Sequence, residues 1–279
     1  MVFIACGDRV EDNVTTALWL FDEPLALYPS SSMDDQTDND NILTLGPGGK
    51  IVEGKFGNAL EPIEQPKVRI PKREELQGLP DDKPKGAELF GLAPESIPEG
   101  RTVEPMNWMN TNFAALMTLG ENHLRKESGH KNPTDSNLNL GDFDWTVEFW
   151  YQATRNTGEV GVVFEIGAGP RGENDQVTSL LLNATNTGFI FKNQPTGIEV
   201  AIPSNAAALD PAVGEWHHLA FVYEMQQDQL KHYVDGVLQP LGDKAVFKIL
   251  PHGDEAYMSI GRSGTWDNPL QGKMDELRF

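Results

Sequence analysis

The chain has 279 residues, an apolar fraction of 39%, and 42 acidic against 22 basic side chains, which gives a formal net charge of −20. A field of this sign repels phosphate backbones and anionic membrane surfaces, so nucleic acid is not an expected partner. The sequence has no run of about 18 apolar residues, so no transmembrane segment is expected either. The length suits one large β domain or two small ones, and we expect one domain with an insertion.

The first residues end in the only cysteine of the chain, Cys6, so no intrachain disulfide can form. Residues 1–7 are apolar and place a small residue before Cys6, which resembles the end of a bacterial lipoprotein signal, where the cysteine carries the lipid. The segment is too short to be a whole signal. The alternative is a first strand with a free thiol. We therefore treat 1–13 as a leader or anchor segment and Cys6 as a candidate lipid anchor.

Short segments with strand character open the rest of the chain. A first strand is predicted at 14–21, and further strands at 42–45, 50–53 and 58–61, separated by glycine-rich turns. Between them, 30–41 is almost wholly polar and is predicted to be a loop. Four of its carboxylates could bind calcium, namely Asp34, Asp35, Asp38 and Asp40. Their spacing does not follow an EF-hand, and an ordinary solvated loop is the simpler interpretation.

A long stretch then breaks the strand pattern. Residues 63–112 contain seven prolines and only local apolar clusters, so we interpret them as an irregular insertion lying over the surface of one domain that covers 14–279. Strand signals resume near residue 113. In 146–152 the side chains alternate, which places Glu148 and Trp150 on one face and Val147, Phe149 and Tyr151 on the other.

The clearest signals lie in 215–239. An eight-residue apolar run, 216–223, is followed by a second at 230–234, and Asp235-Gly236 then provides the pair that a two-residue type I′ turn requires. These segments predict an antiparallel hairpin. Further strands are predicted at 160–166, 179–182, 188–192, 197–202, 246–250, 257–261 and 273–279.

The phrase Trp216-His217-His218-Leu219-Ala220, followed by Tyr233-Val234-Asp235-Gly236, resembles the laminin-G-like family of the concanavalin A-type jelly rolls, which includes pentraxin-like modules. Other phrases agree in order, such as Leu18-Trp19-Leu20-Phe21-Asp22 and Gly272-Lys273-Met274-Asp275-Glu276. The resemblance covers 16–62 and about 113–279. It implies an all-β, antiparallel jelly-roll sandwich.

The resemblance also implies a structural cation, most often calcium, where the first and last strands meet. The matching positions are Asp275, the segment around Asp22, and Gly57, which would offer a carbonyl oxygen. Calcium binds several hard oxygens and accepts carbonyls and waters among them. The alternative is that Asp275 caps a turn or pairs with Lys273 or Arg278.

Two places could bind a sugar. Trp266, with Asp267 and Asn268 beside it, could stack on a sugar ring while its neighbours bind hydroxyls; alternatively it closes the edge of the core. Trp150 beside Glu148 would form a platform if that face of the sheet is open, and would be core if it is covered.

No single predicted strand carries a recognisable catalytic pair of carboxylates. Glucanases of this fold class place two carboxyls about 5 Å apart on one face of a strand, and neither Glu148 nor Glu165 has an acidic neighbour at such a spacing. His217 and His218 are adjacent in a predicted strand and should point to opposite sides, so they cannot bind one metal together.

These observations predict a non-catalytic recognition module, most simply for polysaccharide or glycan, in a secreted or surface-anchored bacterial protein. One alternative is a polysaccharide hydrolase or lyase of the same fold. Another is an adhesive or structural module that binds protein.

Overall fold

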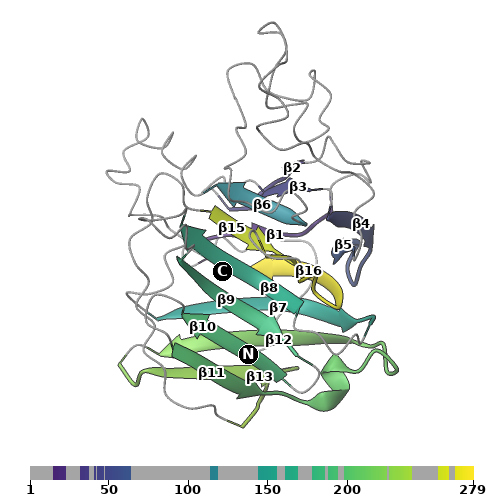
Figure 1. The fold of residues 1–279 in the computed structure, drawn as a ribbon. Helices are drawn as coiled ribbons and strands as arrows, with labels where there is room; N and C mark the ends of the chain where they lie inside the picture. Colours follow the sequence, from purple (N-terminus) through teal and green to yellow (C-terminus); the bar gives the residue numbers. More distant parts are fainter. Residues whose placement is uncertain are drawn as a thin grey trace, which may run out of the picture.

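The computed structural model describes residues 15–22, 32–37, 41, 43–46, 48–63, 114–118, 144–155, 161–168, 178–185, 188–193, 198–224, 226–240, 257–263 and 268–279. Within these residues the chain forms two antiparallel sheets of eight strands each. In Figure 1 strands β8 to β11 of one sheet lie across β7, β12 and β13 of the other. The predicted all-β sandwich is therefore confirmed.

The first sheet carries the hairpin predicted at 215–239. Its order is β14 (Val237–Leu238), β13 (Gln229–Val234), β12 (Trp216–Glu224), β7 (Trp145–Ala153), β16 (Gly272–Arg278), β5 (Asn58–Pro62) and β4 (Gly49–Glu53), with β1 (Leu18–Trp19) also paired to β16. Asp235 and Gly236 have φ values of 50° and 77°, so both take the left-handed conformation of the predicted turn.

The second sheet is ordered β11 (Ile198–Pro203), β10 (Gly188–Asn193), β9 (Thr178–Ala184), β8 (Gly161–Ala168), β15 (Tyr257–Ile260), β6 (Ala115–Thr118), β3 (Leu43–Leu45) and β2 (Ser32–Met33). A short 3₁₀ helix, η4 (Ala206–Leu209), follows β11 and contacts β7.

The core lies between the inner faces of the two sheets. Phe221 of the first sheet meets Phe189 of the second with ring centroids 4.9 Å apart, and Trp145 stacks on Phe191 at 5.7 Å. Each of these side chains is at most 7% exposed. Burial of a large apolar side chain stabilises a fold by about 1.5–3 kcal/mol, so these contacts hold the two sheets together.

One expectation was wrong. Residues 30–41 were predicted to be a loop, but Ser32 and Met33 form strand β2 and pair with Thr44 and Leu43. Met33 is fully buried, and its burial explains why a polar segment contributes a strand.

Asp35, one of the candidate calcium ligands in that segment, has a structural role instead. Its carboxylate accepts hydrogen bonds from Leu18 N, from Thr37 N and Oγ1, and from Asn41 N and Nδ2. Because so many donors converge on it, Asp35 ties the segment to strand β1. Asp38 and Asp40 lie outside the described residues, as do Cys6 and nearly all of the predicted insertion at 63–112.

Candidate functional site

The outer face of the first sheet, which points away from the core, carries the candidate site. Along β7 the residues Trp145, Val147, Phe149, Tyr151 and Ala153 are buried, whereas the residues between them are exposed or half-buried. Glu148 and Trp150 thus lie on the outer face, as the alternation predicted. Pairing places His218 of β12 on one side of Trp150 and Asp275 of β16 on the other.

Trp150 is the centre of an aromatic cluster. The ring of Phe56 meets the indole edge-on at 5.4 Å between centroids, and the ring of His218 lies 5.3 Å away at a tilt of 58°. The ammonium of Lys55 lies 4.8 Å from the centroid of the indole. Phe56 is 42% exposed and Lys55 is also exposed, so the cluster is open to solvent.

Lys55 and Phe56 belong to the turn that joins β4 to β5, and two carboxylates hold that turn in place. Oδ2 of Asp275 accepts hydrogen bonds from Lys55 N at 2.7 Å and Phe56 N at 3.0 Å. Oδ1 of Asp22 accepts one from Asn58 N at 2.8 Å. These contacts therefore show that Asp275 caps a turn, which was the alternative predicted from the sequence.

Gly57 is required in this turn for two reasons. Its φ of +142° is one that residues with a side chain rarely adopt, and a Cβ atom there would lie 2.0 Å from Oδ1 of Asp22. The close approach lets the carboxylate of Asp22 reach the backbone. Asp275, Asp22 and Gly57, which the sequence separates by up to about 250 residues, thus lie together where β1, β5 and β16 converge.

A bulge in β16 brings a third carboxylate to this place. The register between β16 and β7 shifts after Asp275, and Glu276 has a φ of +49°. Its carboxylate accepts a hydrogen bond from the side chain of Trp150. The pKa of Glu276 is raised to about 6, first by burial and then by the charges of Asp275, Asp22 and Glu148, while the hydrogen bond from Trp150 lowers it. Burial also raises the pKa of Asp275.

Glu148 is held between a guanidinium and an imidazole on the same face. Its Oε1 lies 3.4 Å from an Nη1 nitrogen of Arg278, and its Oε2 lies 3.7 Å from Nε2 of His218. Arg278 also donates a hydrogen bond to Thr15. We call the group formed by Trp150, Phe56, Lys55, His218, Glu148 and Arg278 the Trp150 site.

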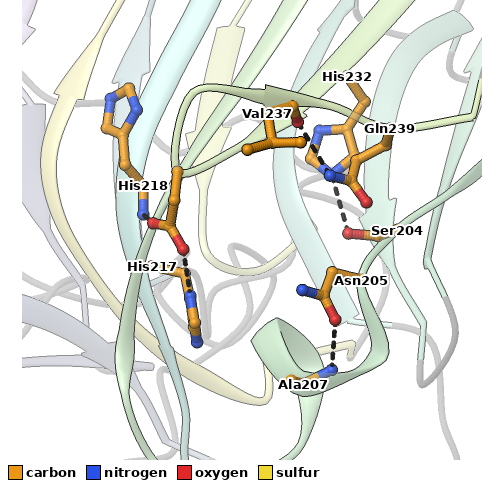
Figure 2. Close-up of polar contacts among 9 residues, drawn as sticks. Ser204, Asn205, Ala207, His217, His218, His232, Val237 and Gln239 are labelled. Atoms are coloured by element: carbon orange, nitrogen blue, oxygen red, sulfur yellow. Dashed lines mark hydrogen bonds and ion pairs between the residues drawn. The ribbon is translucent and has the colours of Figure 1, made fainter.

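The other two histidines that the structure describes, His217 and His232, have structural roles. In Figure 2 His217 and His218 point away from each other, as adjacent strand residues must, and His217 pairs with Asp235 at 2.7 Å. His232 is 1% exposed and lies 2.9 Å from Oγ of Ser204 and 3.2 Å from the carbonyl oxygen of Ala220.

The Ser204–His232 pair is unsuited to nucleophilic catalysis. Burial lowers the pKa of His232 to about 4, so the ring is a poor base near neutral pH. The ring also stacks on Phe221 at 4.4 Å, within the core.

The structure brings together some of the predicted ligand-binding residues and separates others. Trp150 and Glu148 share the Trp150 site. Asn268 lies elsewhere, because its carbonyl oxygen accepts a hydrogen bond from Val162 N of the second sheet. Trp266 and Asp267 lie outside the described residues.

Four residues of the Trp150 site were not predicted from the sequence to bind a ligand: Lys55, Phe56, His218 and Arg278. Glu276 was missed as well. Only His218 had a usable signal, since pairing of the two aromatic strands would place it next to Trp150.

The carboxylates beside the Trp150 site partly fit a calcium ion. Asp22 and Asp275 both accept hydrogen bonds from the turn at 54–58, and Glu276 lies close enough to both for their charges to raise its pKa. Calcium takes six to eight oxygens, so waters would supply the rest. In the described part of the chain, no three histidine, cysteine or acidic side chains are grouped as a ready-made metal site.

Two stacked antiparallel sheets with this strand order define a jelly-roll β-sandwich of the kind found in lectins and glucanases. The sequence profile of the Laminin_G_3 family, described as the concanavalin A-like lectin/glucanases superfamily, matches residues 126–279, which is more than half of the chain. The chain therefore belongs to this superfamily. No curated protein matches the sequence.

Several solved structures are similar to this chain. The binding domain of paraclostridial mosquitocidal protein 1 has 10% identity and a TM-score of 0.49, over 95% of this chain and 48% of that one. This chain thus spans about half the length of that domain.

The Ruminococcus gnavus sialidase CBM40 bound to α2,3-sialyllactose has 18% identity and a TM-score of 0.40, over 52% and 80%. Domain 4 of an extracellular arabinanase from Geobacillus stearothermophilus, in complex with arabinotriose, has 18% identity and a TM-score of 0.40, over 95% and 90%. Because these TM-scores are below 0.5, the similarities assign no ligand to this chain.

Proposed function

We propose that this protein binds carbohydrate at the Trp150 site. The observation that carries the proposal is the exposed Phe56 ring packed on Trp150, beside a carboxylate, a guanidinium and an imidazole on the outer face of the first sheet. Sugar rings pack their C–H groups on aromatic side chains and present hydroxyls to fixed polar groups, which is the combination found here. Membership of a superfamily of lectins and glucanases supports the same conclusion.

The proposed role is recognition without turnover. Glu148 is engaged by Arg278 and His218, and Asp275 is 1% exposed and engaged by the turn at 54–57, which supports a binding role for this face of the sheet. We place the protein outside the cell or on its surface, where polysaccharides are its ligands, with Cys6 as its lipid anchor. The described residues contain no helix with the length and hydrophobicity needed to cross a membrane.

A structural calcium ion beside the site is part of the proposal. Asp22 and Asp275 would supply carboxylate oxygens, and Gly57 keeps Asp22 close to the turn. Bound there, calcium would offset the mutual repulsion of the carboxylates. The turn that carries Lys55 and Phe56 would then be held more firmly.

A glycan array tests the proposed function. We expect the protein to bind a subset of glycans, and we expect the variants Phe56→Ala and Trp150→Ala to lose this binding. The melting temperature of Phe56→Ala should be nearly unchanged, because the Phe56 ring is exposed. Val237→Ala is a matched control, because Val237 is an exposed apolar residue of the same sheet at its far edge. Trp266→Ala tests the second predicted platform. If only Trp266→Ala abolishes retention, the Trp150 site is not the binding site.

One observation favours a second function, polysaccharide hydrolysis. Glu276, with its pKa raised to about 6, and Glu148 come from neighbouring strands, and the charge of Glu148 contributes to that shift. A protonated carboxyl near a carboxylate is the pairing that glycosidases use. Release of reducing ends from a polysaccharide, abolished by either Glu276→Gln or Glu148→Gln, would establish it and refute recognition without turnover.

A further inference from the structure

Lys55 differs from the other lysines that the structure describes. Lys50, Lys192 and Lys231 pair with Glu61, Glu199 and Glu224, and Lys273 donates to the carbonyl oxygen of Glu53. Lys55 has no such acceptor in the described part of the chain. Its ammonium lies instead 4.8 Å from the Trp150 ring centroid and 5.8 Å from that of Phe56. A cation over aromatic rings is stabilised by about 0.5–2 kcal/mol, which holds it there without neutralising it.

The position of Lys55 is set by its own backbone. Asp275 accepts hydrogen bonds from Lys55 N and Phe56 N, so the turn presents both side chains toward Trp150. Asp275 itself is 1% exposed, and Glu148 lies between Arg278 and His218. The exposed Lys55 ammonium therefore lies where a ligand that packs on the aromatic rings can reach it, whereas the two carboxylates are buried or already paired.

From this arrangement we propose that the Trp150 site selects glycans that carry an anionic group, a carboxylate or a sulfate ester, with Lys55 as the specificity-determining residue. The inference rests on the proposed function and names its ligand class. The anionic group pairs with the Lys55 ammonium while the sugar ring packs against Phe56 and the edge of Trp150. A neutral sugar would have to displace the ammonium from the indole and would gain no charge pairing in return.

The net charge of −20 opposes an anionic ligand at long range. That field is screened beyond about 8 Å at physiological ionic strength, so the local ammonium decides binding once the ligand is in contact. An ammonium beside the aromatic rings also allows an acidic protein to bind an acidic ligand at this one place on its surface.

The test compares each acidic glycan with its neutral counterpart. A glycan array would contain uronate, sialate and sulfated glycans beside their carboxyl-reduced or desulfated forms, and the dissociation constants of the retained pairs would be measured by calorimetry. We expect the wild-type protein to retain acidic members and to bind their neutral forms at least about tenfold more weakly, which corresponds to 1.4 kcal/mol. The glycans that the array retains show whether the site binds carboxylate-bearing or sulfate-bearing sugars.

Variants at residue 55 connect this selectivity to its cause. Lys55→Met should weaken binding of the acidic glycan about tenfold and leave the neutral form unchanged or better bound, whereas Lys55→Arg should keep the selectivity. Lys50→Met is the matched control: it makes the same change in net charge five residues away, at a lysine paired with Glu61.

Two outcomes would overturn the inference while the proposed function stands. One is retention of neutral glycans alone in a way that depends on Phe56, and the other is equal binding of acidic glycans by the wild type and Lys55→Met. Retention of no glycan of either class would contradict both the proposed function and the inference.

Discussion

The carboxylate of Asp235 joins the hairpin turn to the start of strand β12. Its Oδ2 lies 2.7 Å from Nδ1 of His217, and its Oδ1 accepts a hydrogen bond from His218 N at 2.9 Å. Asp235 has a φ of 50°, so the same residue provides the left-handed turn conformation and caps the neighbouring strand. The two sequence phrases that carry the family resemblance are therefore in direct contact.

This contact predicts a graded loss of stability. Asp235→Ala removes both hydrogen bonds and should lower the free energy of unfolding by about 2 kcal/mol, while Asp235→Asn tolerates the left-handed conformation and should cost about half as much. Urea denaturation near neutral pH measures both. An Asp235→Ala variant as stable as the wild type would show that the contact contributes nothing.

Two glycines provide a matched pair in turns. Gly57→Ala should lower the free energy of unfolding by about 3 kcal/mol, because its Cβ would lie 2.0 Å from Asp22 and its φ is +142°. Gly236→Ala should cost only about 1–2 kcal/mol, since its φ is +77° but no atom lies within 4 Å of the added Cβ. Equal losses in thermal or urea unfolding would mean that Asp22 does not approach the turn as described.

His232 predicts a loss of stability in acid. Burial lowers its pKa from 6.5 to about 4. As the pH falls from about 6.5 to about 4, the unfolded chain binds a proton that the folded protein does not, and each pH unit costs up to about 1.4 kcal/mol. The loss should total about 3 kcal/mol and then level off.

Urea denaturation over this pH range measures the effect, with His232→Phe as the comparison. The phenylalanine keeps the stacking on Phe221 but leaves Ser204 without its partner, so this variant should be less stable at neutral pH and should show a shallower decline in acid. The same slope in both proteins would contradict the assignment.

Glu276 predicts the opposite dependence. Its pKa is raised from 4.5 to about 6 in the fold, so its ionisation above about pH 6 costs stability, and the cost disappears as the pH falls toward 4.5. In the presence of a chelator, Glu276→Gln should be more stable than the wild type near pH 7, by about 1–2 kcal/mol, and equally stable near pH 4. A glutamine variant that is less stable near pH 7 would contradict this sign.

Calcium should raise the melting temperature of metal-stripped protein, because an ion that binds only the folded state adds to its stability. Asp275→Asn and Asp22→Asn should abolish the response, whereas Asp210→Asn, in the remote turn before β12, should not. With calcium present, the stabilising effect of Glu276→Gln should shrink or reverse. A flat titration of the wild type would count decisively against the metal.

The predictable part of the fold was local. Alternation along β7 and the Asp235-Gly236 pair depend on neighbours in sequence, so both could be predicted. Met33 became a strand residue through its pairing with Leu43, which no local pattern indicates.

The site was harder to predict for the same reason. Lys55 reaches Trp150 across 95 positions of sequence, and Glu276 approaches it through a bulge whose left-handed residue is a glutamate, a type that seldom adopts this conformation. Glu148 lies on β7, whereas Asp275 and Glu276 lie on β16. The spacing of acidic residues within a single strand therefore could not predict that these three carboxylates come together.

Strand β16 lies inside the first sheet, between β7 on one edge and β5 and β1 on the other. Residues 272–278 must therefore leave the ribosome before β1 gains its partner and before the β4–β5 hairpin can join the sheet. The sandwich cannot be completed during synthesis of its earlier strands, and such distant pairing makes folding slow. Until then the nascent sheet has open edges, and open strand edges are prone to pair with other chains.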